Sequence, residues 1–212
     1  MGWLIVVAIF AAFGLRALIL FVYHKRRRAE LANDAKALGL DYFTDLPEKD
    51  WARFQRFERY SYVGETQKVR FALVVETDST RITLCEYDYD PDGESNESST
   101  LLLVQDKRLN IPQFTLCKRT RQLEIFGFSG FEGVEFPEDP EFNSIHMVRG
   151  ESPKAIREFL NSKRRKIFMR RAFMYFEGFE DGFIIDEPRV YLKATDLKDH
   201  VDQSLWILNE LL

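Results

Sequence analysis

Apolar residues form one unbroken run near the start of the chain. Leu4 to Tyr23 is a stretch of 20 residues with a single charge, Arg16. A helix rises about 1.5 Å per residue, so this stretch is about 30 Å long as a helix, which matches the hydrocarbon core of a bilayer. Apolar residues at helical spacing continue to Gly39, a natural helix end. The pattern predicts a transmembrane anchor over residues 1–24 and a juxtamembrane helix over residues 25–40.

Beyond residue 40 the apolar positions change to the two-residue period of β-strands. A short helix that begins at Pro47 comes first, because proline suits the first helical position. The alternation then predicts strands at 59–66, 69–76, 81–90, 100–105, 114–118 and 123–126. The polar stretch Pro91–Ser99 is predicted to be the turn of a long hairpin over residues 81–105.

The last third of the sequence mixes strands and helices. Ser152 and Pro153 are predicted to open a helix that runs through Leu160. Further strands are predicted at 142–148, 173–177, 182–186 and 189–193. A final helix, capped by Thr195 or Asp196, is predicted to present one apolar face made of Leu197, Val201, Leu205, Leu208 and Leu212.

Together these elements predict an α+β protein. An N-terminal transmembrane helix precedes a mainly antiparallel β-sheet domain, with a few packing helices and a C-terminal amphipathic helix. Residues 41–212 are predicted to form the soluble domain, with a possible seam near residues 137–141.

Charges around the apolar run predict its orientation. Trp3 and Tyr23 bracket the run as interfacial aromatics do, and the cluster Lys25, Arg26, Arg27, Arg28 follows it. The positive-inside rule places the N-terminus outside and the domain in the cytoplasm, as a single-pass protein of the cell inner membrane. A cleaved signal peptide is the alternative, but it has bases before the apolar run and small residues after it. Here that order is reversed.

Arg16 is the unusual residue of the predicted span, because a charge at mid-helix costs about 2.5–3.5 kcal/mol to insert. One interpretation is that its long side chain reaches the cytoplasmic headgroups. The other is an ion pair with a partner helix, packed closely against the small residues Ala11, Ala12, Gly14 and Ala17.

Charge and cysteine content exclude some classes of function. Of the 30 bases and 34 acids, residues 1–40 hold six and two, which leaves 24 bases and 32 acids in residues 41–212. Such an acidic domain is not suited to nucleic-acid binding, which requires the neutralisation of phosphates. Cys85 and Cys117 form neither a disulfide framework nor a zinc-site spacing.

An acidic motif on the predicted hairpin resembles the opening of a calcium loop. Asp88, Asp90 and Asp92 are followed by Gly93, but the twelfth position, which requires a bidentate Glu, is Ser99. The alternative, a solvated acidic hairpin tip, is favoured. No metal site is predicted.

A basic stretch near residue 167 is a candidate surface for anionic lipid headgroups or a phosphate-bearing ligand. Its bases are Lys163, Arg164, Arg165, Lys166, Arg170 and Arg171. The alternative is a solvated helix face whose positive charges balance the carboxylates of the domain itself.

No catalytic constellation is visible in the sequence. His24, His146 and His200 have no Cys, Ser or Asp at the spacing of a triad or a metal pair, so structural roles are expected. The chain is predicted not to be an enzyme and to use no cofactor, although a site assembled in space from distant residues remains an alternative.

Several short motifs lie between about residues 35 and 193. They are Ala37-Leu38-Gly39-Leu40 with Tyr42, Phe54 with Phe57, Glu86-Tyr87-Asp88-Tyr89, Ile111-Pro112 with Phe114 and Leu116, and Phe142-Asn143 with Val148-Arg149-Gly150. Together these motifs resemble a widespread family of uncharacterised bacterial proteins that have a membrane anchor and a cytoplasmic domain of unknown function. The resemblance implies the anchored architecture and no activity.

The function predicted from the sequence is a non-enzymatic interaction protein. The partners expected are other membrane protein subunits, for which this chain is an accessory or assembly subunit, and anionic lipid headgroups. The alternative is a ligand- or lipid-sensing module at the membrane surface.

Overall fold

The computed structural model of the chain describes residues 2–57, 68–89, 97–119, 133–170, 175–188 and 192–212; of residues 2–14, 17, 20, 68, 89, 97 and 188 it describes the backbone only. Its helices are α1 (Gly2–Ala37), α2 (Glu48–Phe54), α5 (Pro140–Ile145), α6 (Pro153–Phe159), α7 (Ser162–Arg170), the 3-10 turn η1 (Ala194–Asp196) and α8 (Leu197–Leu211). Its strands are β1 (Asp41–Phe43), β2 (Lys68–Glu76), β3 (Thr80–Tyr89), β4 (Glu97–Asp106), β5 (Ile111–Lys118), β6 (His146–Gly150), β7 (Tyr175–Glu180) and β8 (Gly182–Pro188).

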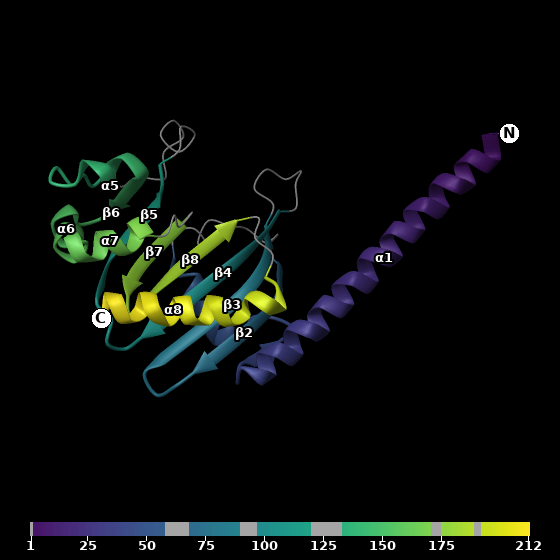
Figure 1. Cartoon of the computed structure of the whole chain (residues 1–212), viewed down its shortest axis with the longest axis horizontal. Coiled ribbons are helices and arrows are strands. Elements are labelled where there is room, and N and C mark those ends of the chain that lie inside the picture. The colour runs from purple at the N-terminus through teal and green to yellow at the C-terminus, as the bar shows by residue number, and fades with distance from the viewer. Residues whose placement is uncertain (1, 58–67, 90–96, 120–132, 171–174, 189–191) are drawn as a thin grey trace.

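The described strands form a single antiparallel sheet in the order β1-β2-β3-β4-β8-β7-β5-β6 (Figure 1). The predicted α+β class and antiparallel sheet are confirmed. The predicted long hairpin is also confirmed, because β3 and β4 pair in continuous register from Thr80 with Asp106 to Tyr89 with Glu97. Its second strand begins earlier than predicted, since residues 97–99, assigned to the turn, belong to β4. Strands from both sides of residues 137–141 belong to this one sheet.

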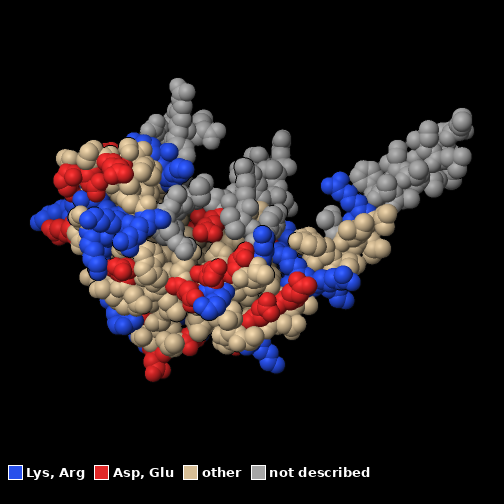
Figure 2. All heavy atoms as spheres, viewed as in Figure 1, with Lys and Arg blue, Asp and Glu red and all other residues tan. Residues whose placement is uncertain are grey.

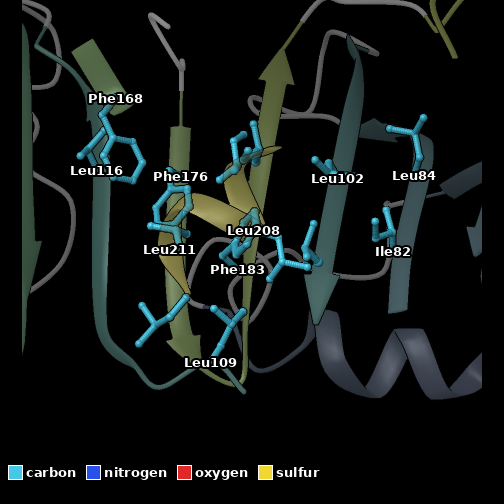
Figure 3. Packing of buried hydrophobic residues seen from close by; sticks show 14 of the residues in the cluster. Ile82, Leu84, Leu102, Leu109, Leu116, Phe168, Phe176, Phe183, Leu208 and Leu211 are labelled. Carbon is cyan, nitrogen blue, oxygen red and sulfur yellow. The ribbon is translucent and has the colours of Figure 1, made fainter. Parts of the chain in front are cut away.

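One face of the sheet carries the larger of two apolar cores. Side chains on a strand alternate between faces, so Ile82 and Leu84 of β3 point to the same side. There they join residues of α1, α6, α7 and α8. Figure 3 shows this layer, in which Leu208 and Leu211 of α8 lie over Phe176 and Phe183 of the central strands.

The opposite face packs against α2. Phe54 of α2 is buried there with Cys85, Leu101 and Ile184 of the sheet. An ion pair fixes this helix, because Arg81 donates to both carboxylate oxygens of Asp50, at 2.8 and 2.6 Å. The sheet is therefore covered on both faces.

Helix α1 is 36 residues long, and only its C-terminal end packs on the domain (Figure 1). Leu31 and Ala35 are fully buried in the larger core. The helix ends as predicted at Gly39, which has a φ of 73°. The amide nitrogen of Leu40 then lies 2.8 Å from the carbonyl oxygen of Ala35, a pairing typical of a glycine-terminated helix.

Among the described residues, no helix combines the length and the apolar character needed to cross a membrane.

Two predictions about the last third are wrong in detail. Residues 140–145 form helix α5 where a strand from Phe142 is predicted, and the strand begins only at His146. Asp139 caps α5, since its side chain accepts a hydrogen bond from the Phe142 amide, and Pro140 follows at the first helical position. The cap at Asp139 and the proline after it therefore favour a helix, although the apolar residues that follow are predicted to form a strand.

The buried face of α8 differs from the predicted one. It consists of Leu197, Ser204, Ile207, Leu208 and Leu211. Leu205 and Leu212 are 41% and 45% exposed. Leucines and isoleucines of α8 define two overlapping stripes at helical spacing, and packing on the sheet selects one of them.

Three predicted strands, 59–66, 123–126 and most of 189–193, lie outside the described residues.

Candidate functional site

The junction between α1 and the sheet is built around one buried ion pair. Arg27 of α1 donates from Nη1 to Oε1 of Glu86 on β3, at 3.1 Å, and from Nη2 to Oε2 of the same carboxylate. Its Nε and Nη2 also donate to the carbonyl oxygen of Leu192, at 3.1 and 2.6 Å. The Arg27 side chain is 12% exposed and that of Glu86 is fully buried. One guanidinium therefore connects α1, β3 and the segment before η1.

Glu86 occupies a position of β3 at which the alternation of apolar residues predicts an apolar side chain. It follows Ile82 and Leu84 on the side of the sheet that forms the larger core. A buried carboxylate is stable only with partners, and besides Arg27 two other described residues contact Glu86. The Leu192 amide donates to it at 3.3 Å, and Nη1 of Arg70 lies 3.7 Å away.

The ion pair and the apolar contacts lie on one face of α1. Arg27, Leu31 and Ala35 are spaced by four residues, so their side chains point the same way. Because the first is paired with Glu86 and the other two are fully buried, this part of α1 is fixed to the sheet. The part of α1 before it extends away from the domain (Figure 1).

Most of the other predicted anchor residues lie on this projecting part, whereas Arg28 follows Arg27 on the part that packs on the sheet. Arg16, Tyr23, Lys25, Arg26 and Arg28 are exposed. The side chain of Trp3 lies outside the described residues. Arg27, predicted with them as an interfacial cation, instead points into the domain.

The basic stretch forms α7, and its cations have two kinds of surroundings. Arg165 is only 3% exposed. It contacts Asp139 at 2.7 Å and Glu138 at 3.0 Å, and its guanidinium lies over the ring of Phe136. The prediction that Arg165 contacts lipid headgroups is therefore wrong, because its ion pairs hold the side chain inside the domain.

Arg164 has a structural role as well. It donates to the carbonyl oxygen of Leu211 at 2.7 Å, and its guanidinium lies 4.3 Å from the centre of the Phe159 ring. It thus connects α7 with the end of α8. The exposed cations of the stretch are Lys163, Lys166 and Arg170, and Arg171 lies outside the described residues.

The acidic motif is only partly described, because residues 90–93 lie outside the described part. Its first residue, Asp88, accepts hydrogen bonds from Nε of Arg70 at 2.8 Å and from the hydroxyl of Ser98 at 2.5 Å. Among the described residues, no three His, Cys, Asp or Glu side chains are grouped so that they could hold a metal ion.

His146 and Cys85 are deeply buried in the domain. His146 is 2% exposed and stacks on Phe142, with 4.9 Å between ring centres. Burial lowers the pKa of His146 to about 4, so its imidazole is neutral at neutral pH. Burial also raises the pKa of the Cys85 thiol well above its ordinary value, which keeps it protonated. Neither group is a nucleophile or base exposed to a substrate.

Reasoning from the sequence missed Glu86, the central acid of the junction. The signal available was its position two residues after Leu84 in an alternating apolar series. That break in the pattern marks a buried acid but does not identify Arg27, 59 residues away, as its partner.

No family model matches the chain, and no curated protein matches it. Among solved structures, the fold is similar to the crystal structure of the mycobacterial trehalose monomycolate transport factor A, TtfA. The match has a TM-score of 0.58 and covers 87% of this chain and 90% of that chain, at 12% sequence identity. A likeness at this identity shows a common fold and does not extend to function.

Proposed function

We propose that this chain is a single-pass membrane protein that serves as a non-enzymatic accessory or assembly subunit of a larger membrane protein complex. Its anchor is residues 1–24, its N-terminus lies outside, and its domain lies in the cytoplasm. The bacterial family that its motifs resemble has the same anchored arrangement.

The observation that carries the proposal is the contrast between the two halves of α1. The C-terminal end is fixed to the sheet by Leu31, Ala35 and the ion pair of Arg27 with Glu86. The half before it exposes a series of large apolar side chains, which are Leu15, Leu18, Ile19, Phe21, Val22 and Tyr23. A continuous exposed apolar surface indicates a membrane or a partner protein.

A rigid junction has a mechanical consequence that suits an accessory subunit. Because α1 is one continuous helix from Gly2 to Ala37, no hinge separates its apolar half from the part that packs on the domain. The orientation of the apolar half therefore determines the orientation of the domain. A partner that contacts the anchor therefore also determines where the domain lies.

The structural neighbour is compatible with this role. The protein with the similar fold is described as a transport factor. We extend to this chain only the general idea of an accessory factor.

A lipid-sensing module at the membrane surface is the alternative. Its supporting observation is that Lys163, Lys166 and Arg170 of α7 are exposed. The alternative has become weaker, because Arg164 and Arg165 of the same stretch are engaged within the domain.

Extraction in a mild detergent followed by a native size measurement separates the two functions. The accessory role predicts that the tagged chain co-migrates with other membrane proteins in one large species. A monomer that binds anionic vesicles would instead support the lipid-sensing module.

A further inference from the structure

A groove of about 340 Å³ lies beside the junction, between α1 and the segment that leads into α8. Its lining residues are Tyr23, Arg26, Arg27, Glu30, Lys193, Ala194 and Thr195. Figure 2 shows Lys and Arg side chains gathered on the part of α1 nearest the domain.

Helix geometry and the ion pair together form this groove. Tyr23, Arg26 and Glu30 are spaced by three and four residues, so they share one side of α1. The hydrogen bonds from Arg27 to the Leu192 carbonyl hold the next residue, Lys193, against that side. The two walls are therefore fixed relative to each other.

The charges that line the groove favour a small anion. Arg27 is already paired with Glu86, whereas Arg26 and Lys193 are exposed and form no ion pair with a described residue. Glu30 is the single acid of the lining and limits its net positive charge. Two cations and one acid that line the same groove suit a single phosphate better than a polyanion.

We propose that this groove binds the phosphate of an anionic lipid headgroup. The inference rests on the proposed membrane anchor, because the groove begins at Tyr23, where the predicted span ends and the headgroups begin. A phosphate there contacts Arg26 and Lys193 from the bilayer side. A soluble phosphate ester offers the same chemistry, so the test must separate the two sources.

The test measures lipid bound to the full chain, purified in a neutral detergent, by native mass spectrometry. The probes are phosphatidylglycerol, phosphatidylcholine and glycerol 3-phosphate. The groove variant is Arg26→Gln with Lys193→Gln. The matched control is Lys36→Gln with Lys154→Gln, which removes two exposed charges elsewhere. The single variant Lys193→Gln replaces the double variant should the latter fail to fold.

The wild type and the control are expected to retain one phosphatidylglycerol molecule in preference to phosphatidylcholine. The groove variant is expected to lose about tenfold or more in affinity, because each base near an anionic surface contributes about a factor of five. Equal binding by the groove variant and the control, or equal binding of the two lipids, would overturn the proposal. Glycerol 3-phosphate that binds as tightly as phosphatidylglycerol would overturn the lipid assignment.

Carbonate extraction of membranes keeps this test separate from the proposed function. A chain that stays in the membrane and co-migrates with partners, yet shows no groove-dependent lipid, contradicts the headgroup site alone. A chain released by carbonate contradicts the anchor itself.

Discussion

Arg27 and Glu86 form a bidentate ion pair across 59 residues of sequence, and this pair connects the long helix with the third strand of the sheet. Because the Glu86 side chain is fully buried, its charge is compensated by the protein and not by water. The pair therefore determines how the projecting half of α1 is oriented relative to the domain.

Arg27→Met is expected to destabilise the domain by about 3–5 kcal/mol, because it leaves a buried carboxylate without its main partner. Thermal unfolding of the full chain in a mild detergent, followed by circular dichroism, measures the loss. Arg28→Met is the matched control, since Arg28 is exposed one residue further along α1.

The double variant Arg27→Met with Glu86→Leu is expected to recover more than half of that loss, because no charge is then left unpaired. Equal stability of Arg27→Met and Arg28→Met would show that the ion pair does not hold the junction.

Arg165→Met is expected to cost about 2 kcal/mol, the usual range for hydrogen bonds to a charged group. The hydrogen bond from Arg165 lowers the pKa of Asp139, so that pKa should also rise in the variant. NMR titration of the carboxylate and thermal unfolding measure the two effects. Lys166→Met, which removes an exposed neighbour, should leave the stability unchanged and raise the pKa of Asp139 less, because the charge of Lys166 lowers that pKa less than the hydrogen bond from Arg165 does. Reduced vesicle binding without a loss of stability in Arg165→Met would contradict the internal role of this residue.

Stability should decrease on mild acidification because of His146. Burial lowers the pKa of His146 to about 4 in the folded chain, against about 6.5 when it is exposed. Below pH 6.5 the unfolded chain binds a proton that the folded chain does not, so this contribution is complete above pH 6.5 and is lost as the pH falls towards 4. The loss between pH 7 and 5 is about 2 kcal/mol.

His146→Leu should remove most of this dependence, as measured by the change in melting temperature between pH 7 and 5. His200 of α8 is only partly buried, and His200→Leu is the control, which should retain the wild-type slope. An unchanged slope in His146→Leu would assign the acid sensitivity to other groups.

The elements that the sequence predicts well are those with strong local signals. The β3–β4 hairpin follows from a two-residue period, and the end of α1 follows from Gly39. The face of α8 could not be predicted, because Leu205 and Ile207 fit competing stripes and only packing on the sheet decides between them.

The candidate site was less predictable than the fold. Arg27 is one of four consecutive bases, and nothing local distinguishes it from Arg26 or Arg28. Arg27 faces Glu86 because it lies on the same side of α1 as Leu31 and Ala35. Which side of α1 is buried depends on contacts between segments that are distant in the sequence. The same reason explains why Arg165 and Lys166 are adjacent in sequence but differ in burial.

The orientation of the predicted span is tested with a C-terminal reporter that is active only outside the cytoplasm. Because Lys25–Arg28 follow the apolar run, the reporter should stay silent. A reporter active only inside the cytoplasm, fused at the same site, is the control and should be active. The opposite pair of results would contradict a cytoplasmic domain.

Arg16 provides the most direct test of the accessory role, through the native size of the complex extracted in a mild detergent. Arg16→Leu removes a charge from the predicted span, so membrane insertion should be equal or better. If Arg16 pairs with a partner helix, Arg16→Leu leaves the charged group of that partner unpaired and away from water. Arg16→Lys keeps the positive charge but loses the planar geometry of the guanidinium. We predict a large complex for the wild type, loss of the co-migrating partners in Arg16→Leu and partial recovery in Arg16→Lys, with all three chains in the membrane fraction. A complex of unchanged size in Arg16→Leu, or a monomeric wild type, would contradict the account.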